Sequence, residues 1–295
     1  MTALTLLIIY CLLISLVSLL GGWLPTRLKM THTRTQLLMS FVAGLMLGIA
    51  FYHLLPHAIY TLPEAGGVDQ AVWWLMVGLL FMFVLLRMFH FHQHGHKQEE
   101  CQHDHGGPGH QVNRLSWIGV ALGLGLHTII DGVALGAAVQ AGIGEDAGVF
   151  GLVGLGVFVA VALHKPLDAM SIASLLMASH ASAKTRMWVI GLFSLLCPLG
   201  AMLFFLGVAQ FGQQSSTAVG IALAFSAGVF ICISLSDLLP EVQFHSHDRL
   251  KLTLALLLGI TAAYGIGMLE PAHGHHEDEE SHHALFTIEV SADRS

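Results

Sequence analysis

Residues 115–139 read LSWIGVALGLGLHTIIDGVALGAAV, and residues 148–178 form a second long apolar run. Each run carries an imidazole and a carboxylate at positions i and i+4 near its middle: His127 with Asp131, and His164 with Asp168. Such positions lie on one face of an α-helix, so each pair presents its two side chains together. Ionisable groups inside a membrane are costly and by default mark a functional site. Two such pairs on successive helices predict a four-ligand cation site.

The whole chain has the composition of a membrane protein. Of its 295 residues, 55% are hydrophobic and 11% are charged, and the mean hydropathy is +0.71. Runs of about 20 apolar residues predict transmembrane helices. The sequence therefore predicts an all-α, polytopic membrane protein with eight transmembrane helices, at about 3–23, 37–59, 71–89, 115–139, 148–178, 187–210, 217–240 and 250–269. The fifth run is long enough to require tilt or an extension beyond the bilayer.

The first apolar run is expected to be retained as a helix. No basic residue precedes it and no small-residue cleavage pattern is evident, so it differs from a signal peptide. The four cysteines are scattered along the chain and predict no disulfide framework.

The basic residues predict how the helices are oriented. Ten of the 12 Lys and Arg residues lie in or beside the segments after helices 1, 3, 5 and 7, and the segments after helices 2, 4 and 6 contain none. The exceptions are Lys165, inside the fifth run, and Arg294, near the end of the chain. Both termini are therefore predicted to be extracytoplasmic, in a plasma membrane or the inner membrane of a Gram-negative cell. The net charge of −7 reflects outer acidic residues, which either attract cations or form ordinary solvated loops.

An internal repeat links the two halves of the chain. Residues 41–57 align without gaps on residues 225–241 and are identical at 7 of 17 positions, including a shared Leu-Leu-Pro. By the charge rule the first copy runs outward and the second inward, as do the two His-x-x-x-Asp motifs. This predicts a 3+2+3 inverted-repeat bundle, with helices 1–3 mirrored by helices 6–8 around helices 4 and 5. Inverted repeats around a midplane site are typical of secondary transporters; chance likeness between apolar helices is the alternative.

The residue types in the two motifs indicate which ion they would bind. Imidazole and carboxylate ligands suit zinc, iron, manganese or cobalt, and the lack of thiolates argues against a dedicated copper(I) site. Two aspartates also balance a divalent charge. A single membrane histidine often only makes an interhelical hydrogen bond, but two antiparallel copies favour a metal site. Pro166 removes a backbone donor within the fifth helix, which predicts either a simple kink or a break that lines a cavity.

These features resemble the ZIP (Zrt/Irt-like) family of divalent-metal transporters, over about residues 3–270. The resemblance rests on the eight spans, on a His-rich linker between helices 3 and 4, and on two motifs: His127-x-x-x-Asp131-Gly132 and His164-Lys165-Pro166-x-Asp168. It implies a 3+2+3 bundle that imports metal toward the cytoplasm. It also implies a metal site between helices 4 and 5, with four ligands: His127, Asp131, His164 and Asp168.

The chain departs from the family pattern at the second metal position. Many members have Asn after the first His and an acid after the helix-5 His, where this chain has Thr128 and Lys165. Many also close each motif with Glu, where this chain has Asp131 and Asp168. Lys165 is predicted to take the second position as a built-in cation, as in the branch of the family that carries His-Lys. The alternatives are that Lys165 only pairs with Asp168 or extends toward the surface.

The two Leu-Leu-Pro ends carry further polar residues. His53 and His57 are predicted at the outer end, and Asp237 and Glu241 at the inner end. We interpret them as relay ligands on the way in and on the way out. Polar caps at the membrane interface fit the same residues equally well.

Two polar segments are rich in histidine. The predicted cytoplasmic linker, residues 90–113, holds seven histidines among Gly, Gln and Pro, a composition typical of disorder. We interpret it as a weak metal buffer or sensor. The extracytoplasmic tail, residues 271–295, adds histidines beside acidic residues and could collect metal. The chain is thus divided into a transmembrane domain, 1–270, and this tail.

The sequence as a whole favours an importer of divalent transition metal, with zinc as the first candidate, and no enzyme activity. Metal ions are its substrate rather than a cofactor, and the predicted partners are these ions and the lipid bilayer, without nucleic acid. A homodimer is compatible with the sequence. Two alternatives are a membrane-embedded zinc hydrolase, since His and Asp ligands with an open position also activate water, and a passive metal-sensing receptor. The hydrolase is disfavoured by the lack of His-Glu-x-x-His and by the inverted repeat.

Overall fold

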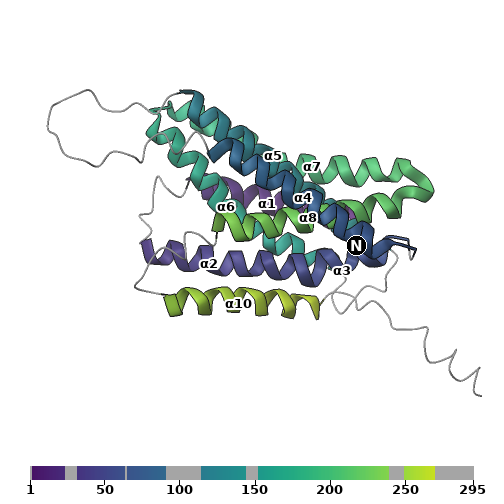
Figure 1. Ribbon diagram of the computed structural model, residues 1–295. Helices are drawn as coiled ribbons and strands as arrows, with labels where there is room; N and C mark the ends of the chain where they lie inside the picture. The colour runs from purple at the N-terminus through teal and green to yellow at the C-terminus, as the bar shows by residue number, and fades with distance from the viewer. Residues whose placement is uncertain are drawn as a thin grey trace, which may run out of the picture.

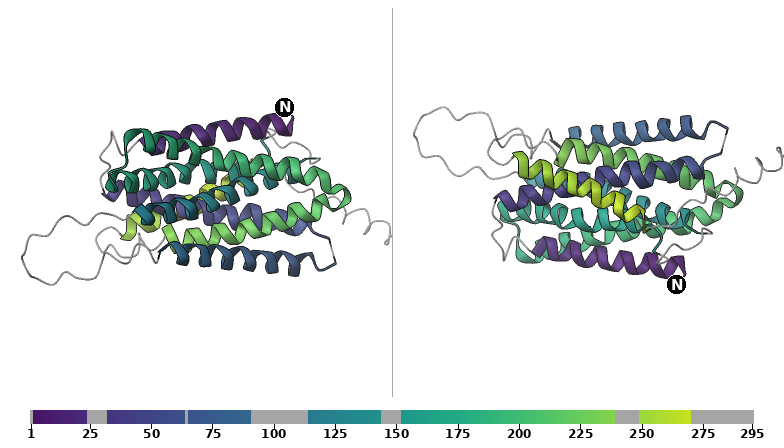
Figure 2. Two further views of the ribbon diagram at one scale, coloured as in Figure 1. Left: turned by 90° about the horizontal axis from the view of Figure 1, so that it is seen from above. Right: turned by 90° about the horizontal axis from the view of Figure 1, so that it is seen from below.

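The computed structural model describes residues 2–23, 32–63, 65–90, 114–143, 152–238 and 249–269. Within these ranges the regular elements are all helices, and eight spans are long and apolar enough to cross a membrane (Figures 1 and 2). They are α1 (Ala3–Trp23), α2 (His32–Ile49) continued by η2 (Ala50–Leu54) and α3 (Leu55–Thr61), α4 (Gly67–His90), α5 (Arg114–Ala141), α6 (Leu155–Ala178), α7 (Ala183–Val208), α8 (Ser215–Ile233) continued by η5 (Ser234–Leu238), and α10 (Arg249–Gly267). A 3-10 turn, η4 (Ala209–Gln214), joins α7 to α8.

The predicted all-α fold with eight spans is confirmed, but the fifth span is shorter than expected. Gly154 has φ = 70°, in the left-handed region that glycine adopts readily, and α6 begins directly after it. The helix therefore has 24 residues, an ordinary membrane-spanning length. The apolar run 148–178 is thus longer than the helix, because hydropathy does not register a backbone turn inside an apolar run. The last two residues of the predicted seventh span lie outside the described residues.

The helix pairs follow the predicted two-fold relation between the halves. The second span packs along the eighth, as α2 against α10, and the third packs along the seventh, as α4 against α8. The two-fold relation exchanges spans 1, 2, 3 and 4 with spans 6, 7, 8 and 5. It converts the α2–α10 pair (spans 2 and 8) into the α8–α4 pair (spans 7 and 3). It likewise converts the α1–α6 pair (spans 1 and 5) into the α7–α5 pair (spans 6 and 4). The inverted repeat read from the sequence is therefore present in the packing.

Details of the backbone repeat as well. Gly44 of α2 lies against the carbonyl of Leu256, and Gly228 of α8, at the equivalent position of the repeat, lies against the carbonyl of Leu75. A Cβ at either glycine would overlap that carbonyl, so close helix packing requires glycine at both places. The π-helical turns η2 and η5 also occupy equivalent positions of the repeat. Each directly precedes the Leu-Pro of its copy, where proline cannot donate to the preceding turn.

The centre of the bundle lies between α5, α6 and α8. Along α8 most side chains are buried, whereas α1, α4, α7 and α10 expose many large apolar side chains, as expected of helices that face lipid. α5 and α6 contact each other, and both contact spans of the two mirrored halves. This arrangement places the two ionisable motifs in the interior of the bundle.

Candidate metal site

The structure brings the two predicted pairs together at the contact of α5 with α6. His127, Asp131, His164 and Asp168 each offer one ligand atom, and these four atoms all lie within 4.8 Å of one another. The first three side chains are buried, and Asp168 is 15% exposed. The i, i+4 spacing predicted that each pair would share a face, and packing of the two faces against each other completes the cluster.

The nitrogen–oxygen distances within the cluster are close to those between neighbouring ligands of a zinc ion. Asp131 Oδ2 lies 3.3 Å from His127 Nε2 and 3.2 Å from His164 Nε2, and Asp168 Oδ2 lies 3.6 Å and 3.9 Å from the same two nitrogens. Zinc binds His and Asp ligands at about 2.0–2.1 Å, so neighbouring ligands in a tetrahedron lie about 3.3–3.4 Å apart. Three of the four nitrogen–oxygen distances are within a few tenths of an ångström of this value.

Hydrogen bonding orients His164 toward its two carboxylates. Its Nδ1–H donates to the backbone carbonyl of Ala160 at 2.8 Å, so in the neutral ring Nε2 carries the lone pair. This lone pair faces Oδ2 of Asp131, which is also a hydrogen-bond acceptor. The nitrogen and the oxygen attract each other only when a cation lies between them. That cation can be a proton, which gives a hydrogen bond, or a metal ion. A second ring nitrogen bonded to a backbone carbonyl is the usual support of a metal-binding histidine.

Two polar atoms of the cluster have no hydrogen-bond partner among the described residues. They are Nδ1 of His127 and Oδ1 of Asp131, both buried. Buried polar groups normally have a hydrogen-bond partner, and one without a partner calls for an explanation such as a bound ion. The cluster is therefore not arranged as a fully satisfied structural network.

Lys165 points into the cluster rather than toward the membrane surface. Its amino group is buried and donates to Oδ2 of Asp131 and, at 2.9 Å, to Oδ2 of Asp168. It also donates to Oγ1 of Thr128 at 3.2 Å. Of the two alternatives, pairing with Asp168 is present, and extension to the surface is wrong because the side chain is buried. The Oδ2 atoms of the two aspartates that lie near the histidine nitrogens are the same atoms that accept from Lys165.

Three residues make contacts at the site that were not anticipated from the sequence: Thr128, Phe193 and Phe230. The Thr128 hydroxyl accepts from Lys165 and itself donates to the carbonyl of Leu124 at 2.7 Å. The ring of Phe230 on α8 meets His164 edge-on at 6.3 Å, and the ring of Phe193 on α7 lies 5.9 Å from the Lys165 amino group. Thr128 could have been suspected from its place beside His127. An aromatic residue in an apolar helix gives no such signal.

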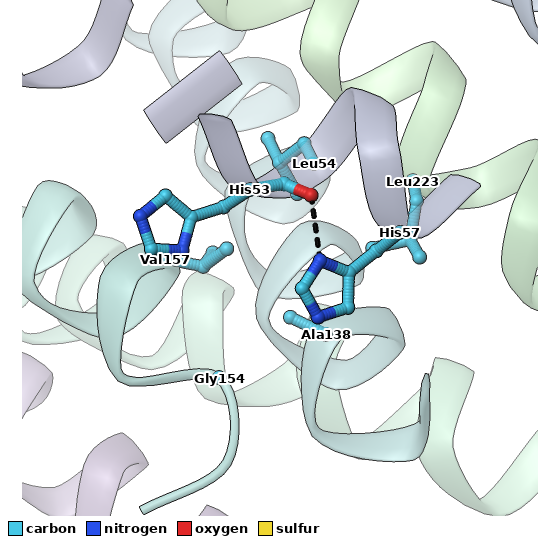
Figure 3. Close-up of a pocket in the computed structure, with 7 residues that line it drawn as sticks. All are labelled: His53, Leu54, His57, Ala138, Gly154, Val157 and Leu223. Carbon is cyan, nitrogen blue, oxygen red and sulfur yellow. Dashed lines mark hydrogen bonds between the residues drawn. The ribbon is translucent and has the colours of Figure 1, made fainter. Parts of the chain in front are cut away.

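His53 and His57 lie together at a separate small cavity of about 20 Å³ (Figure 3). His53 Nε2–H donates to the carbonyl of Ala263 on α10 at 2.9 Å, and its ring lies close against Gly156 of α6. His57 Nδ1–H donates to the carbonyl of His53 at 2.8 Å. The cavity is just large enough for one water-sized sphere. These two histidines are thus close to each other but are not part of the four-residue cluster.

Several predicted features lie outside what the structure describes. Asp237 belongs to the π-helical turn η5, but its side chain is not described, and Glu241 lies beyond the described residues. The same holds for the His-rich linker after His90 and for the tail 271–295. At Pro166 the helix α6 continues without interruption, and the proline backbone lies against Gly21 of α1.

Comparison with known proteins identifies the family. The family described as ZIP zinc transporter matches residues 86–267. The zinc transporter ZIP9-B of Xenopus laevis is 27% identical over 298 aligned positions, which cover 88% of this chain and 91% of its own. Zinc transporter ZIP9 of Micropogonias undulatus is 28% identical over 285 positions, covering 80% of this chain and 86% of its own. The chain therefore belongs to the ZIP family, and it is a multi-pass membrane transporter rather than the hydrolase that the His and Asp ligands alone also allowed.

Proposed function

We propose that this protein imports zinc into the cytoplasm through the cluster of His127, Asp131, His164 and Asp168. The observation that carries the proposal is that two imidazole nitrogens and two carboxylate oxygens lie within 4.8 Å of one another inside a membrane-spanning bundle. A binding site for a divalent ion within the membrane must balance the ion's charge, and the two aspartate carboxylates supply two negative charges. Iron, manganese and cobalt accept the same ligands, and the names of the relatives favour zinc.

The proposed mechanism is alternating access around this cluster. The inverted repeat supports it, because two mirrored halves allow the same site to be exposed first to one side of the membrane and then to the other. His53 and His57 would receive the ion on the outer side. Asp237 and Glu241 would receive it on the inner side, before the His-rich linker. This relay rests on the sequence positions and, for the histidines, on their shared cavity.

Lys165 would hold the position that a second metal ion takes in other family members. Its amino group contacts the same oxygens of Asp131 and Asp168 that face the two histidines. A carboxylate that bridges two metals would here bridge one metal and one ammonium group. The proposed transport site therefore holds a single ion.

Uptake into sealed vesicles tests the proposed activity. The purified full-length protein, reconstituted into vesicles, is expected to move zinc into the lumen, with iron, manganese and cobalt measured in parallel. Membrane potential and pH gradient are varied separately to find the energy source. Protein-free vesicles give the background, and folded protein that moves none of these metals above that background would contradict the proposal.

Thiol labelling tests the proposed direction. Cys101 lies in the His-rich linker and is expected to be protected from a membrane-impermeant thiol reagent in intact cells, whereas a Glu145→Cys variant should react. The reason is the one-sided distribution of Lys and Arg. The other cysteines, Cys11, Cys197 and Cys232, are buried and give little background. Permeabilised cells, in which Cys101 should react, provide the control; the reverse labelling pattern would overturn the import direction.

A further inference from the structure

We propose that a groove at one end of the bundle, formed by the ends of α1 and α6 and the start of α7, binds one anionic glycerophospholipid. The groove has a volume of about 420 Å³. Its wall is apolar and includes Leu19 of α1, Ala173 and Met177 of α6, and Ile190 of α7. Among the described residues that line the groove, the charged one is Arg186, in the first turn of α7. An apolar channel with a guanidinium group at its end matches an acyl chain joined to a phosphate.

The groove lies at the depth of the lipid headgroups. Trp23 ends α1 and lines the groove, and Trp188 lies in the second turn of α7; their side chains are 53% and 72% exposed. Tryptophan gathers where membrane meets water, so these residues mark that boundary on both helices. Arg186 is at the level where a phosphate group resides, and the apolar wall continues along the helices toward the hydrocarbon.

The charges at the groove favour an anionic headgroup. Among the described residues the guanidinium group of Arg186 makes no ion pair or hydrogen bond, and a planar guanidinium binds a phosphate through two parallel hydrogen bonds. The start of the 26-residue helix α7, where Ala183 also lines the groove, adds a partial positive charge. Among the described residues that line the groove, none is acidic, so none would receive the ammonium group of a zwitterionic headgroup. A lipid whose only charge is negative is therefore preferred.

The position of the groove gives the lipid a connection to transport, a point that rests on the proposed function. Ala173 and Met177 belong to α6, the helix that carries His164 and Asp168. A lipid in the groove would contact α6, α1 and α7 at once and would hold them in their present relation. Binding itself does not depend on metal, so it can be measured on metal-free protein whether or not the transport proposal holds.

Native mass spectrometry of the full-length protein tests the site. With equal amounts of phosphatidylglycerol and phosphatidylcholine, we expect one phosphatidylglycerol to be retained preferentially. Arg186→Gln should reduce its retention about fivefold, the effect of one basic residue at an anionic headgroup. Lys184→Gln removes the same charge from an exposed neighbour that does not line the groove, and it should leave retention unchanged. Equal losses in the two variants, or equal retention of both lipids, would overturn the proposal.

A second variant separates the acyl groove from the charge. Ala183→Phe places a ring at the rim of the groove without changing any charge, and it should lower phosphatidylglycerol retention while thermal stability in detergent stays at the wild-type value. Glycerol phosphate, which has the phosphate but no acyl chain, should not bind the wild-type protein. Unchanged lipid retention in Ala183→Phe, or binding of glycerol phosphate as tight as that of the lipid, would show that Arg186 binds a phosphate without the groove.

Discussion

Replacing His127 or His164 by alanine is expected to reduce zinc uptake to the background of protein-free vesicles. Each histidine supplies one of the four ligand atoms that lie within 4.8 Å of one another. Loss of a supporting contact of a metal ligand costs about 10–100-fold in affinity, and loss of the ligand itself should cost more than that. The remaining three groups would leave the ion short of a donor in a place where water cannot easily replace it.

The measurement is initial zinc uptake at matched protein density in the vesicles. A useful control is His180→Asn, which removes a histidine outside the cluster; His180 has φ = 54°, a conformation that asparagine adopts more readily than other residues. This variant should transport at the wild-type rate. Folding of the alanine variants is checked by their elution as a single species and by retained helical content. Wild-type uptake in either alanine variant would mean that the cluster is not on the transport path.

The ionisable motifs could be found from the sequence because charges are rare in apolar helices. The pairs His127/Asp131 and His164/Asp168 are conspicuous against their surroundings, and helix geometry dictates that each pair shares a face. The eight spans follow from hydropathy in the same way, and the repeat follows from direct comparison of residues 41–57 with 225–241. For the motifs and the spans one physical property, charge or apolar length, is enough for the inference.

The contacts around the site could not be found in this way. In a membrane both the buried and the lipid-facing sides of a helix are apolar, so the pattern along α8 does not reveal that Phe230 faces His164. The direction of Lys165 was equally open, because its long side chain could reach lipid headgroups or the interior. Packing of α5 against α6 decides this, since it places Asp131 and Thr128 within reach of the amino group. The start of α6 after Gly154 could not be found from hydropathy either, because the apolar run continues on both sides of the glycine.

Lys165→Glu is expected to change the number of ions in the transport site from one to two. In the wild-type site two aspartates, the lysine and one divalent ion sum to a net charge of +1, if both histidines are neutral. With glutamate at position 165 the site reaches the same net charge only when two divalent ions are bound. In the wild-type protein a second ion would lie close to the ammonium group, and two unit charges at 4 Å repel by about 4 kcal/mol at an effective dielectric constant of 20. The repulsion is about twice that for a divalent ion.

The metal-free variants should also be less stable than the wild type. Lys165 is the described cation that pairs with both Asp131 and Asp168, and removing one partner of a buried ion pair costs about 3–5 kcal/mol. Zinc should restore that stability, so the rise in Tm on adding zinc is expected to be larger in Lys165→Met and Lys165→Glu than in the wild type. Lys165→Met leaves a site of net charge −2 before metal binds. It should therefore bind a single zinc ion more tightly and release it more slowly, which would appear as slower uptake.

Metal counting decides whether Lys165 replaces a second ion. The protein used should lack residues 92–110 and 273–283, so that the histidines of the linker and the tail do not contribute ions. We expect one zinc ion per chain with Lys165 or Met at this position and two with Glu. The neutral Lys165→Met variant keeps the test informative even if glutamate beside two aspartates prevents folding without metal, because its single, tightly held ion is a separate expectation. Two ions in the transport site of the protein that retains Lys165 would show that the ammonium group moves aside when metal binds, and that two metals fit between these carboxylates despite the charge.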